Sequence, residues 1–333
     1  MTGRKRTRNG TEGSGAGAPD GGPGRAAARE TDRAAVAPDG GPIVDAHHHI
    51  WRQADLPWLM GPTQPRIFGP YDAIKRDYPV EEFLADVAGS GVVKSVYVQA
   101  NWAPNWAADE AAWVQSVADA AGWPHAIVGF ADFTRGDVRR QLDRLARSPL
   151  MRGVRQQLHW HENPLYRFAR RPDLAADPTV RANVARLSDY GWTFELQVFA
   201  PQMADAAGLA RACPEVTVVL QHAGMLEDLS DPGREAWERG MARLAACPNV
   251  VSKLSAFGTF VHRNDPELIA WIVARTIDLF GAERCLFGSN FPIEKLWTDY
   301  RSLADAHRAA VAAAAPGHQR AVLHDNAIRI YRL

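Results

Sequence analysis

The sequence predicts a single (β/α)₈ barrel, an α/β fold in which eight parallel strands alternate with helices around a closed cylinder. Short apolar runs alternate with longer amphipathic runs, as expected for buried strands and surface helices. The short runs are apolar almost throughout, as in Val216–Leu220, which is typical of parallel strands covered on both faces. Eight such strand–helix pairs occupy about 290 residues, close to the usual size of this barrel.

The elements follow in chain order from these runs. The predicted strands are Ile43–Trp51, Val92–Ala100, Ala126–Asp132, Arg152–Leu158, Thr193–Phe199, Val216–His222, Val250–Ser255 and Arg284–Asn290. The predicted helices are Val80–Ala88, Asp109–Ala121, Val138–Arg147, Thr179–Tyr190, Pro201–Ala212, Gly233–Ala246, Pro266–Phe280, Asp299–Ala314 and Gly317–Ile328. Two long connections, Arg52–Pro79 and His159–Pro178, follow the first and fourth strands, at the barrel end where such folds build active sites.

The structural alternative is an open, doubly wound parallel sheet. Such a sheet usually carries a glycine-rich phosphate-binding loop directly after its first strand. In this chain that position holds His47, His48 and His49. The pattern therefore favours the closed barrel.

Composition and charge argue against several classes of partner. The chain has 333 residues, of which 46% are hydrophobic and 23% charged, as in an ordinary globular protein. Its 38 basic and 38 acidic side chains cancel, so net charge favours neither a nucleic-acid nor a membrane partner. Cys213, Cys247 and Cys285 form no CxxC pair, which argues against thiolate-bound zinc. We therefore expect a small-molecule substrate rather than a nucleic-acid or membrane partner, and leave open a homo-oligomer.

The first residues differ in composition from the rest of the chain. Residues 1–41 are rich in Gly, Ala, Arg and Pro and lack large apolar runs, so they are predicted to form a disordered tail before a barrel domain of residues 42–333. The tail lacks the apolar centre of a secretory signal peptide. No apolar run reaches the roughly 18 to 20 residues that span a bilayer. We expect a cytoplasmic protein.

Two histidines at the end of the first strand mark the expected site. Strand alternation places Asp45, His47 and His49 on one face and Ala46 and His48 on the other. A single strand histidine is usually a core residue. Two imidazoles on one face at a barrel mouth can instead chelate a metal or polarise a substrate carbonyl.

The fourth strand adds further polar groups on one face. Alternation there brings Arg155, Gln157 and His159 together. An inward arginine needs an anion, which a ligand or a protein carboxylate such as Asp132 or Glu195 could supply. His161 and Glu162 follow on the loop, where they are either surface groups or substrate contacts.

Other strand ends supply polar side chains as well. The fifth strand offers Glu195 and Gln197, the sixth ends at His222, and the seventh carries Lys253 and Ser255. Polar groups at the ends of several strands are typical of barrel enzymes. The predicted catalytic residues are His47, His49, His222 and Asn290. The predicted substrate-binding residues are Arg155, Gln157, His159, Gln197, Gln99 and His161.

Four segments together resemble one known family. They are Asp45-x-His47-x-His49, Gly153–His159, Leu220–Gly224 and Arg284–Pro292. In this order on strand ends they resemble the amidohydrolase-2 branch of the amidohydrolase superfamily, which contains sugar lactonases and 2-pyrone-4,6-dicarboxylate lactonase. The resemblance covers essentially the whole chain from residue 43 and implies a hydrolase on a metal-dependent-hydrolase-like barrel.

The resemblance also assigns roles. His47 and His49 correspond to first-strand histidines that bind a divalent metal in some members and polarise the substrate carbonyl in metal-free lactonases. His222 corresponds to the sixth-strand histidine. Asn290 stands where an aspartate usually activates water, and Gln197 stands where many members have a metal-binding histidine. The predicted cofactor is therefore none, or a weakly bound divalent metal such as zinc on His47, His49 and His222.

The leading functional hypothesis is hydrolysis of a lactone or cyclic ester of a sugar acid or carboxylated ring. His47 and His49 would donate to the carbonyl oxygen or hold a weak metal, and Asn290 would hold the water. His222 or His159 would accept the proton, since an unperturbed imidazole pKa of about 6.5 suits that task. One alternative is a metal-dependent decarboxylase or C–N hydrolase. Another is a barrel that binds a small acid or sugar without turnover.

Overall fold

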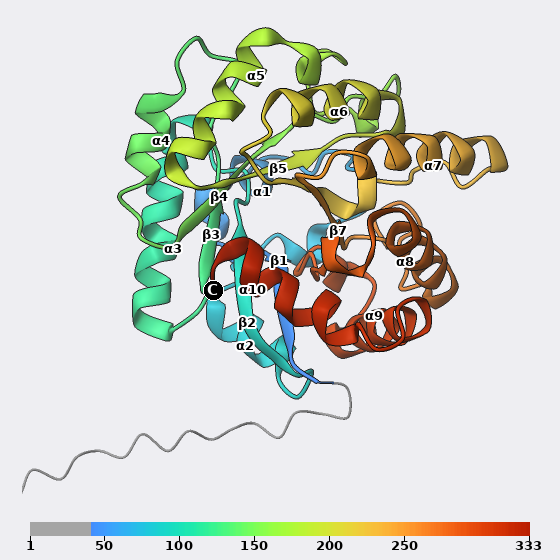
Figure 1. The fold of residues 1–333 in the computed structure, drawn as a ribbon. Helices are drawn as coiled ribbons and strands as arrows, with labels where there is room; N and C mark the ends of the chain where they lie inside the picture. Colours follow the sequence, from blue (N-terminus) through green and yellow to red (C-terminus); the bar gives the residue numbers. More distant parts are fainter. Residues whose placement is uncertain (1–40) are drawn as a thin grey trace, which may run out of the picture. The chain divides into compact units, whose positions relative to one another are not determined.

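The eight predicted strands form one parallel sheet that curls into a nearly closed barrel (Figure 1). The computed structural model describes residues 41–333. Neighbouring strands pair in sequence order, β1 to β8, and every pairing is parallel. The strands are β1 Ile43–His48, β2 Val92–Val98, β3 Ala126–Gly129, β4 Met151–Gln157, β5 Thr193–Gln197, β6 Val218–Leu220, β7 Val250–Leu254 and β8 Cys285–Phe287.

Helices surround the strands and complete the predicted (β/α)₈ architecture. The helices are α1 Pro57–Met60, α2 Val80–Val87, α3 Ala107–Ala121, α4 Arg139–Leu145, α5 Pro178–Ala185, α6 Met203–Ala212, α7 Asp231–Ala245, α8 Pro266–Phe280, α9 Tyr300–Ala314 and α10 Asn326–Tyr331. The fold class is confirmed. Figure 1 shows them as an outer ring, with α10 crossing in front of the barrel.

Several of these helices begin at side chains that satisfy free backbone N–H groups. The Asp177 carboxylate accepts from the N–H groups of Thr179 and Val180 at the start of α5. Asp265 accepts from the N–H of Leu268 at the start of α8. Such caps stabilise a helix by about 1 kcal/mol each. They explain why these helix starts agree closely with the sequence pattern.

The strand ends are shorter than predicted where the chain turns toward the site. The sixth strand ends at Leu220 because His222 and Ala223 adopt left-handed backbone angles, with φ of 57° and 44°. The eighth strand ends at Phe287, and Asn290 has φ of 59°. A strand cannot continue through such angles, so both polar tips lie on turns.

Most helix ends shift by one or two residues from their predicted bounds, and two of the predicted helices also change helix type along part of their length. The segment predicted as Thr179–Tyr190 is α-helical only to Ala185 and continues as a 3₁₀ turn over Arg186–Tyr190. The last predicted helix, Gly317–Ile328, is a π-helical segment over Ala321–Asp325 followed by α10.

The first and last strands close the barrel through a few backbone contacts. The Asn290 N–H donates to the His47 carbonyl at 2.7 Å, and the His49 N–H donates to the Phe291 carbonyl at 2.8 Å. Gly288 permits this approach, since a Cβ there would lie 2.7 Å from His47 Cβ. The closure brings the first-strand histidines beside the end of the eighth strand.

An ion pair fills part of the barrel interior below the site. Lys253 on β7 donates to Glu195 on β5 at 2.9 Å, and both side chains are fully buried. The other oxygen of Glu195 accepts from the hydroxyl of Tyr331, which belongs to α10. This network ties the C-terminal helix to the barrel interior.

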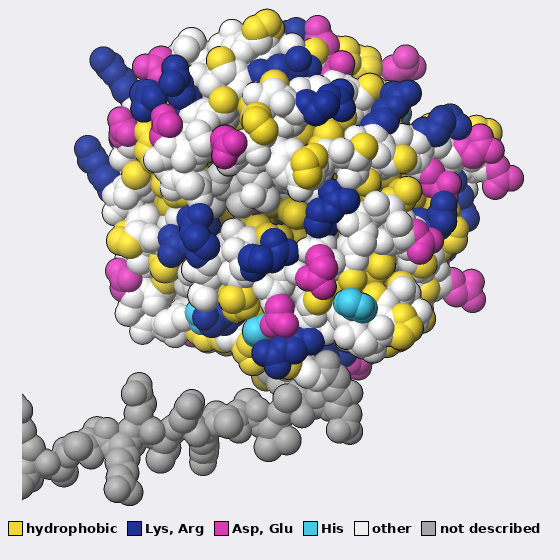
Figure 2. All heavy atoms as spheres, in the orientation of Figure 1, with side chains coloured by type: hydrophobic (Ala, Val, Ile, Leu, Met, Phe, Trp, Pro, Cys, Tyr) yellow, Lys and Arg dark blue, Asp and Glu magenta, His cyan; other side chains and the backbone are white. Residues whose placement is uncertain are grey.

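The surface charge, the length of the helices and the N-terminal segment complete the description of the fold. The face in Figure 2 carries basic side chains interspersed with acidic and apolar ones. Within residues 41–333, none of the helices combines the length and apolar character needed to cross a membrane. The tail predicted for residues 1–41 lies outside the described residues apart from Gly41, so the predicted domain boundary stays a prediction.

Candidate active site

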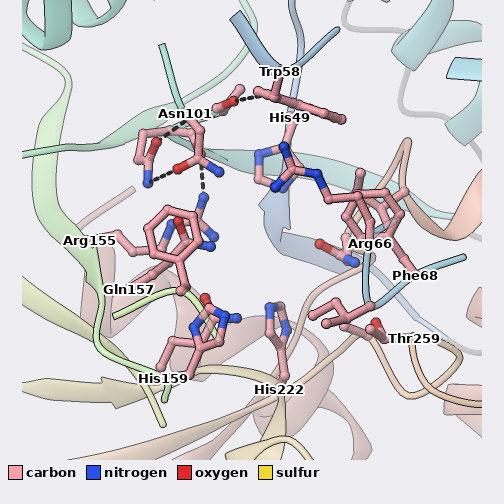
Figure 3. Close-up of a pocket in the computed structure, with 18 of the residues that line it drawn as sticks. His49, Trp58, Arg66, Phe68, Asn101, Arg155, Gln157, His159, His222 and Thr259 are labelled. Atoms are coloured by element: carbon pink, nitrogen blue, oxygen red, sulfur yellow. Dashed lines mark hydrogen bonds between the residues drawn. The ribbon is translucent and has the colours of Figure 1, made fainter. Parts of the chain in front are cut away.

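A cavity of about 590 Å³ opens at the C-terminal ends of the strands. This volume suits a small-molecule ligand. All eight strand ends or the loops after them contribute to its walls. Figure 3 shows His49 and His222 on opposite sides of it, Arg155, Gln157 and His159 along one wall, and Arg66 and Phe68 across from that wall. Of the predicted site residues, His49, Gln99, Arg155, Gln157, His159, Gln197, His222 and Asn290 line the cavity.

The strand-one alternation is only partly as predicted. His47 and His49 lie together, with ring centroids 5.1 Å apart, and His48 points away and stacks on Phe83 of α2. Asp45, however, accepts from the hydroxyls of Ser289 and Tyr300 rather than facing the site. The reason is a register irregularity between Asp45 and His48, which interrupts strict alternation.

His49 has a defined tautomer in this arrangement. Its Nδ1 lies 2.6 Å from the Val98 carbonyl, so Nδ1 carries the proton and Nε2 keeps its lone pair. Burial lowers the pKa of His49 to about 3, so the ring is neutral. A neutral His49 with this tautomer accepts hydrogen bonds at Nε2, which replaces its predicted role as a donor to the carbonyl oxygen.

His47 lies beneath the cavity floor and does not line it. Its ring is fully buried, 4.8 Å from the ring of His222, and neither ring nitrogen has a hydrogen-bond partner among the described residues. Burial first, and then the charge of Lys253, hold the pKa of His47 well below its usual value. His47 is therefore a neutral imidazole that can meet a ligand atom reaching the floor.

A strained turn presents His222 to the cavity. The left-handed angles at His222 and Ala223 continue into Gly224, where φ is 72° and a Cβ would lie 2.2 Å from Met203. His222 Nδ1 lies 2.8 Å from the hydroxyl oxygen of Ser255. This contact orients the ring so that Nε2 is available to the cavity. Burial holds the pKa of His222 well below its usual value.

Arg155 is a buried cation facing the cavity. Its guanidinium donates to the Gln99 carbonyl and, at 3.4 Å, to Gln221 Oε1, while its Nε has no partner among the described residues. Neither carboxylate considered from the sequence pairs with it directly. Asp132 instead accepts a hydrogen bond from the hydroxyl of Thr134, and Glu195 forms its ion pair with Lys253. Burial lowers the pKa of Arg155 to about 10, so it remains charged at neutral pH.

The other predicted substrate contacts divide into two groups. Gln157 Oε1, Gln197 Oε1 and His159 Nδ1 are buried without a hydrogen-bond partner among the described residues, and all three residues line the cavity. Burial also lowers the pKa of His159 to about 3, so the ordinary value of 6.5 does not apply there. His161 is outside the lining residues, with Nε2 3.8 Å from Glu227, and we do not retain it as a substrate contact.

The charged side chains that line the cavity are all basic among the described residues. Three arginines, Arg66, Arg155 and Arg167, line it, whereas no Asp or Glu is among its described lining residues. Much of the remaining wall is aromatic, including Trp58 and Phe68. Trp51, Trp58 and Trp102 line the cavity, whereas Trp106 and Trp160 do not. The arrangement suits an anion that carries a ring or another apolar face.

Sequence reasoning missed one acidic residue beside the site. Glu294 is fully buried at the start of the 3₁₀ turn that follows β8, where its N–H donates to the Asn290 carbonyl and its Oε2 accepts from Trp297 Nε1. Burial raises the pKa of Glu294 to about 8. No sequence pattern marked this residue, because Asn290 has a left-handed backbone angle and the 3₁₀ turn begins only at Glu294.

The side chains present do not fit a tight divalent-metal site. His47, His49 and His222 are neutral imidazoles, and the neighbouring Gln197 and Asn290 are amides where a metal site would gain from a carboxylate. Across residues 41–333, no group of three His, Cys, Asp or Glu side chains has an arrangement that could hold a metal ion. The unpartnered nitrogens of His47 can instead meet a substrate or water oxygen.

Comparisons with known proteins identify the family of this chain. The amidohydrolase family profile matches residues 44–333. An uncharacterized Sinorhizobium fredii protein, y4mH, is 35% identical over 297 residues, covering 87% of this chain and 98% of that protein. An L-fucono-1,5-lactonase of Burkholderia ambifaria is 28% identical, covering 87% of this chain and 95% of its own. The crystal structure of a Burkholderia multivorans amidohydrolase with bound zinc superposes with a TM-score of 0.73 at 26% identity, covering 88% of this chain and all of that one.

Proposed function

The chain belongs to the amidohydrolase family, and from that premise we propose that it hydrolyses a lactone whose ring carries a carboxylate. The observation that carries the proposal is that one cavity holds both a buried arginine with no carboxylate partner among the described residues and a cluster of neutral histidines. The L-fucono-1,5-lactonase relative supports lactone chemistry. In this proposal the substrate carboxylate binds at the wall formed by Arg155, and the lactone carbonyl lies next to His49 and His222.

Arg155 anchors the substrate carboxylate. Arg155 lines the cavity, and its Nε is buried without an acceptor among the described residues, so a carboxylate bound at the guanidinium would complete its hydrogen bonds. The lack of acidic side chains among the described lining residues leaves this charge available to a ligand. Arg66 and Arg167 add positive potential, which favours an anionic substrate.

His222 accepts the proton from the attacking water. The proposal requires the tautomer of His222 in which Nδ1–H donates to the Ser255 hydroxyl, 2.8 Å away, because Nε2 then presents a lone pair to the cavity. The depressed pKa of His222 keeps it in the unprotonated form that a base requires. An anionic substrate or developing oxyanion nearby raises the imidazole pKa, because an opposite charge favours the protonated ring. His159 is the second candidate for this role.

The chemical step balances with these groups alone. The water oxygen forms a bond to the lactone carbonyl carbon, and the carbonyl π electrons move onto its oxygen. Collapse of that intermediate breaks the ring C–O bond. The imidazolium returns its proton to the departing alkoxide oxygen, which leaves a hydroxy acid. The product carboxylic acid then loses a proton to solvent.

A lactone panel tests the proposal. Pairs of carboxylated and neutral lactones of matched ring size are assayed with a pH indicator, with and without a chelator. We expect turnover of carboxylated lactones that the chelator leaves intact, and a loss of two or more orders of magnitude in His222→Ala. Thermal unfolding of His222→Ala serves as the control for folding.

Other outcomes would assign the chain differently. Turnover that the chelator abolishes and stoichiometric zinc or manganese restores would favour a metal-dependent decarboxylase or C–N hydrolase. Ligand-induced increases in melting temperature without any product would favour a binding protein. Either result would refute metal-independent lactone hydrolysis.

A further inference from the structure

The cavity has two levels that differ in their chemistry. Buried polar side chains such as Arg155, His159 and Gln197 form an inner level at the strand ends. An outer level, nearer the mouth, is apolar and partly open to solvent. Leu165 and Phe168 belong to it, and they are 39% and 48% exposed although they line the cavity. Apolar surface left open around a pocket is typical of a region that a ligand covers.

The outer level is built by the two long connections that follow β1 and β4. The connection after β1 supplies Trp58 and Phe68, whose ring centroids lie 6.2 Å apart. The connection after β4 supplies Phe168, whose ring lies 5.5 Å from the ring of His159. Figure 3 shows Phe68 across the cavity from His159. A flat group that enters between these walls therefore meets aromatic rings on both sides.

Hydrogen bonds hold both aromatic walls in place. Trp58 Nε1 donates to the Ala100 carbonyl at 3.0 Å, which ties the first connection to the end of β2. The N–H groups of Phe168 and Ala169 both donate to the His159 carbonyl, at 3.1 and 2.9 Å. Rings that are positioned in advance lose little conformational entropy when a ligand binds. The outer level is therefore suited to binding rather than being a chance gathering of loop residues.

Charge at the outer level favours an aromatic ligand group. Arg66 lies over the Trp58 ring, with its guanidinium carbon 5.8 Å from the ring centroid, and its Nε is buried without a hydrogen-bond partner among the described residues. Arg167 also lines the cavity. A guanidinium attracts the electron-rich face of an aromatic ring, and an aliphatic group has no such face. The outer level should therefore prefer an aryl group to an alkyl group of the same size.

The size of the cavity leaves room for such a group. A six-membered lactone with one carboxylate has only about ten non-hydrogen atoms, whereas cavities of roughly 300–1,000 Å³ suit drug-sized ligands. This cavity, at about 590 Å³, falls in that range. A small lactone bound at Arg155 and His222 would fill the inner level and leave the outer level open. Because both levels belong to one cavity, an extension of the same substrate can reach the outer level.

We propose that the substrate lactone carries an aryl substituent besides its carboxylate, and that this substituent binds in the outer level between Phe68 and Phe168. The carboxylate binds Arg155, the lactone carbonyl lies next to His49 and His222, and the aryl group extends toward the mouth. The identity of the reacting group rests on the proposed lactone hydrolysis. The aryl site itself does not, so binding and turnover test the two separately.

The first experiment measures binding and needs no turnover. Isothermal titration calorimetry compares propanoate, 3-cyclohexylpropanoate and 3-phenylpropanoate, which share the carboxylate and differ in the extension. In wild type, phenylpropanoate should bind about tenfold or more tightly than propanoate, because it buries an apolar ring. It should bind about twofold or more tightly than the cyclohexyl probe, because of the aromatic and guanidinium contacts. Equal affinities for the phenyl probe and either of the others would overturn the proposal.

Variants then locate the site of the preference. Phe68→Ala and Phe168→Ala should each remove most of the preference for phenylpropanoate over propanoate. Trp106→Ala is the matched control, because Trp106 is an aromatic residue that is 58% exposed but does not line the cavity, and it should keep the preference. A loss in Trp106→Ala as large as in the two lining variants would overturn the assignment. Melting temperatures check folding, and the wild-type comparison of probes needs no variant.

The second experiment measures turnover of two carboxylated lactones that differ only in a phenyl group or a hydrogen at one ring position. Wild type should hydrolyse the phenyl lactone with a kcat/KM about tenfold or more higher. A preference for phenylpropanoate without hydrolysis of any lactone would refute the lactonase proposal and leave the aryl site standing. Faster hydrolysis of the unsubstituted lactone would overturn the aryl site.

The other occupant that this mouth could accept is a second copy of the chain. Sedimentation of wild type and Phe168→Ala tests it. A wild-type dimer that Phe168→Ala dissociates, together with equal affinities for the three probes, would assign the exposed apolar side chains to a dimer contact and overturn the proposal. We expect the same oligomeric state in both proteins.

Discussion

Replacing Arg155 with methionine removes the cation that we place opposite the substrate carboxylate. Methionine has a similar length and no charge, so the wall keeps most of its shape. Two groups lose a donor, the Gln99 carbonyl and Gln221 Oε1. Arg155→Lys is the matched variant, because it keeps the positive charge but presents no fork to a carboxylate.

The expected effect follows from the contacts of the guanidinium. A hydrogen bond to a charged group contributes about 1.5–3 kcal/mol, which is roughly a 10- to 150-fold change in kcat/KM. Arg155 is 4% exposed, so water screens this interaction little. We expect Arg155→Met to lose this factor on carboxylated lactones and Arg155→Lys to lose less.

The assay compares a carboxylated lactone with its neutral amide or ester analogue in each variant. A neutral analogue lacks the anion, so Arg155→Met should change its kcat/KM much less. Circular dichroism and melting temperature check that the barrel is intact. Equal losses on the charged and neutral lactones would refute the anchoring role, since that pattern reports general damage to the cavity.

Three further predictions concern the floor of the site and the barrel interior. His47→Ala and His49→Ala should each lower kcat by about 10²–10⁴-fold with an unchanged far-UV spectrum, and wild-type rates in both would remove them from the site. Asn290→Asp adds a carboxylate beside three imidazoles, so it should change the pH–rate profile and raise the divalent-metal content measured by elemental analysis. A pH–rate profile and a metal content identical to those of wild type would show that residue 290 takes no part in catalysis. Lys253→Met should lower the free energy of unfolding by about 3–5 kcal/mol, because Glu195 loses its buried cation. The double variant Lys253→Met/Glu195→Gln should recover part of that free energy, and equal denaturant midpoints for the single and the double variant would contradict this reasoning.

The sequence predicted the barrel because its signals are local and repeated. Each strand is an apolar run, and caps such as Asp177 and Asp265 set helix starts from neighbouring residues alone. The same logic placed Arg155 and Gln157 on one wall, because a regular strand alternates strictly. Alternation failed at Asp45, where a register irregularity that no local pattern marks turns the side chain toward α9.

Tertiary structure alone decided the electrostatic state of the site. Free imidazoles titrate near pH 6.5, yet burial lowers the pKa of His49 and of His159 to about 3, so they are neutral acceptors rather than acids. The partner of Glu195 is Lys253 rather than Arg155, which only the three-dimensional packing of the barrel interior could determine.

The sequence by itself thus determined the barrel and which polar residues end its strands, since periodicity and caps act over a few neighbours. Only the folded chain decided that His47 lies under the floor, that Arg155 has no carboxylate partner among residues 41–333 and that Glu294 is buried beside Asn290. These properties depend on desolvation and on contacts between residues far apart in the chain. Neither quantity is encoded in any short stretch of sequence.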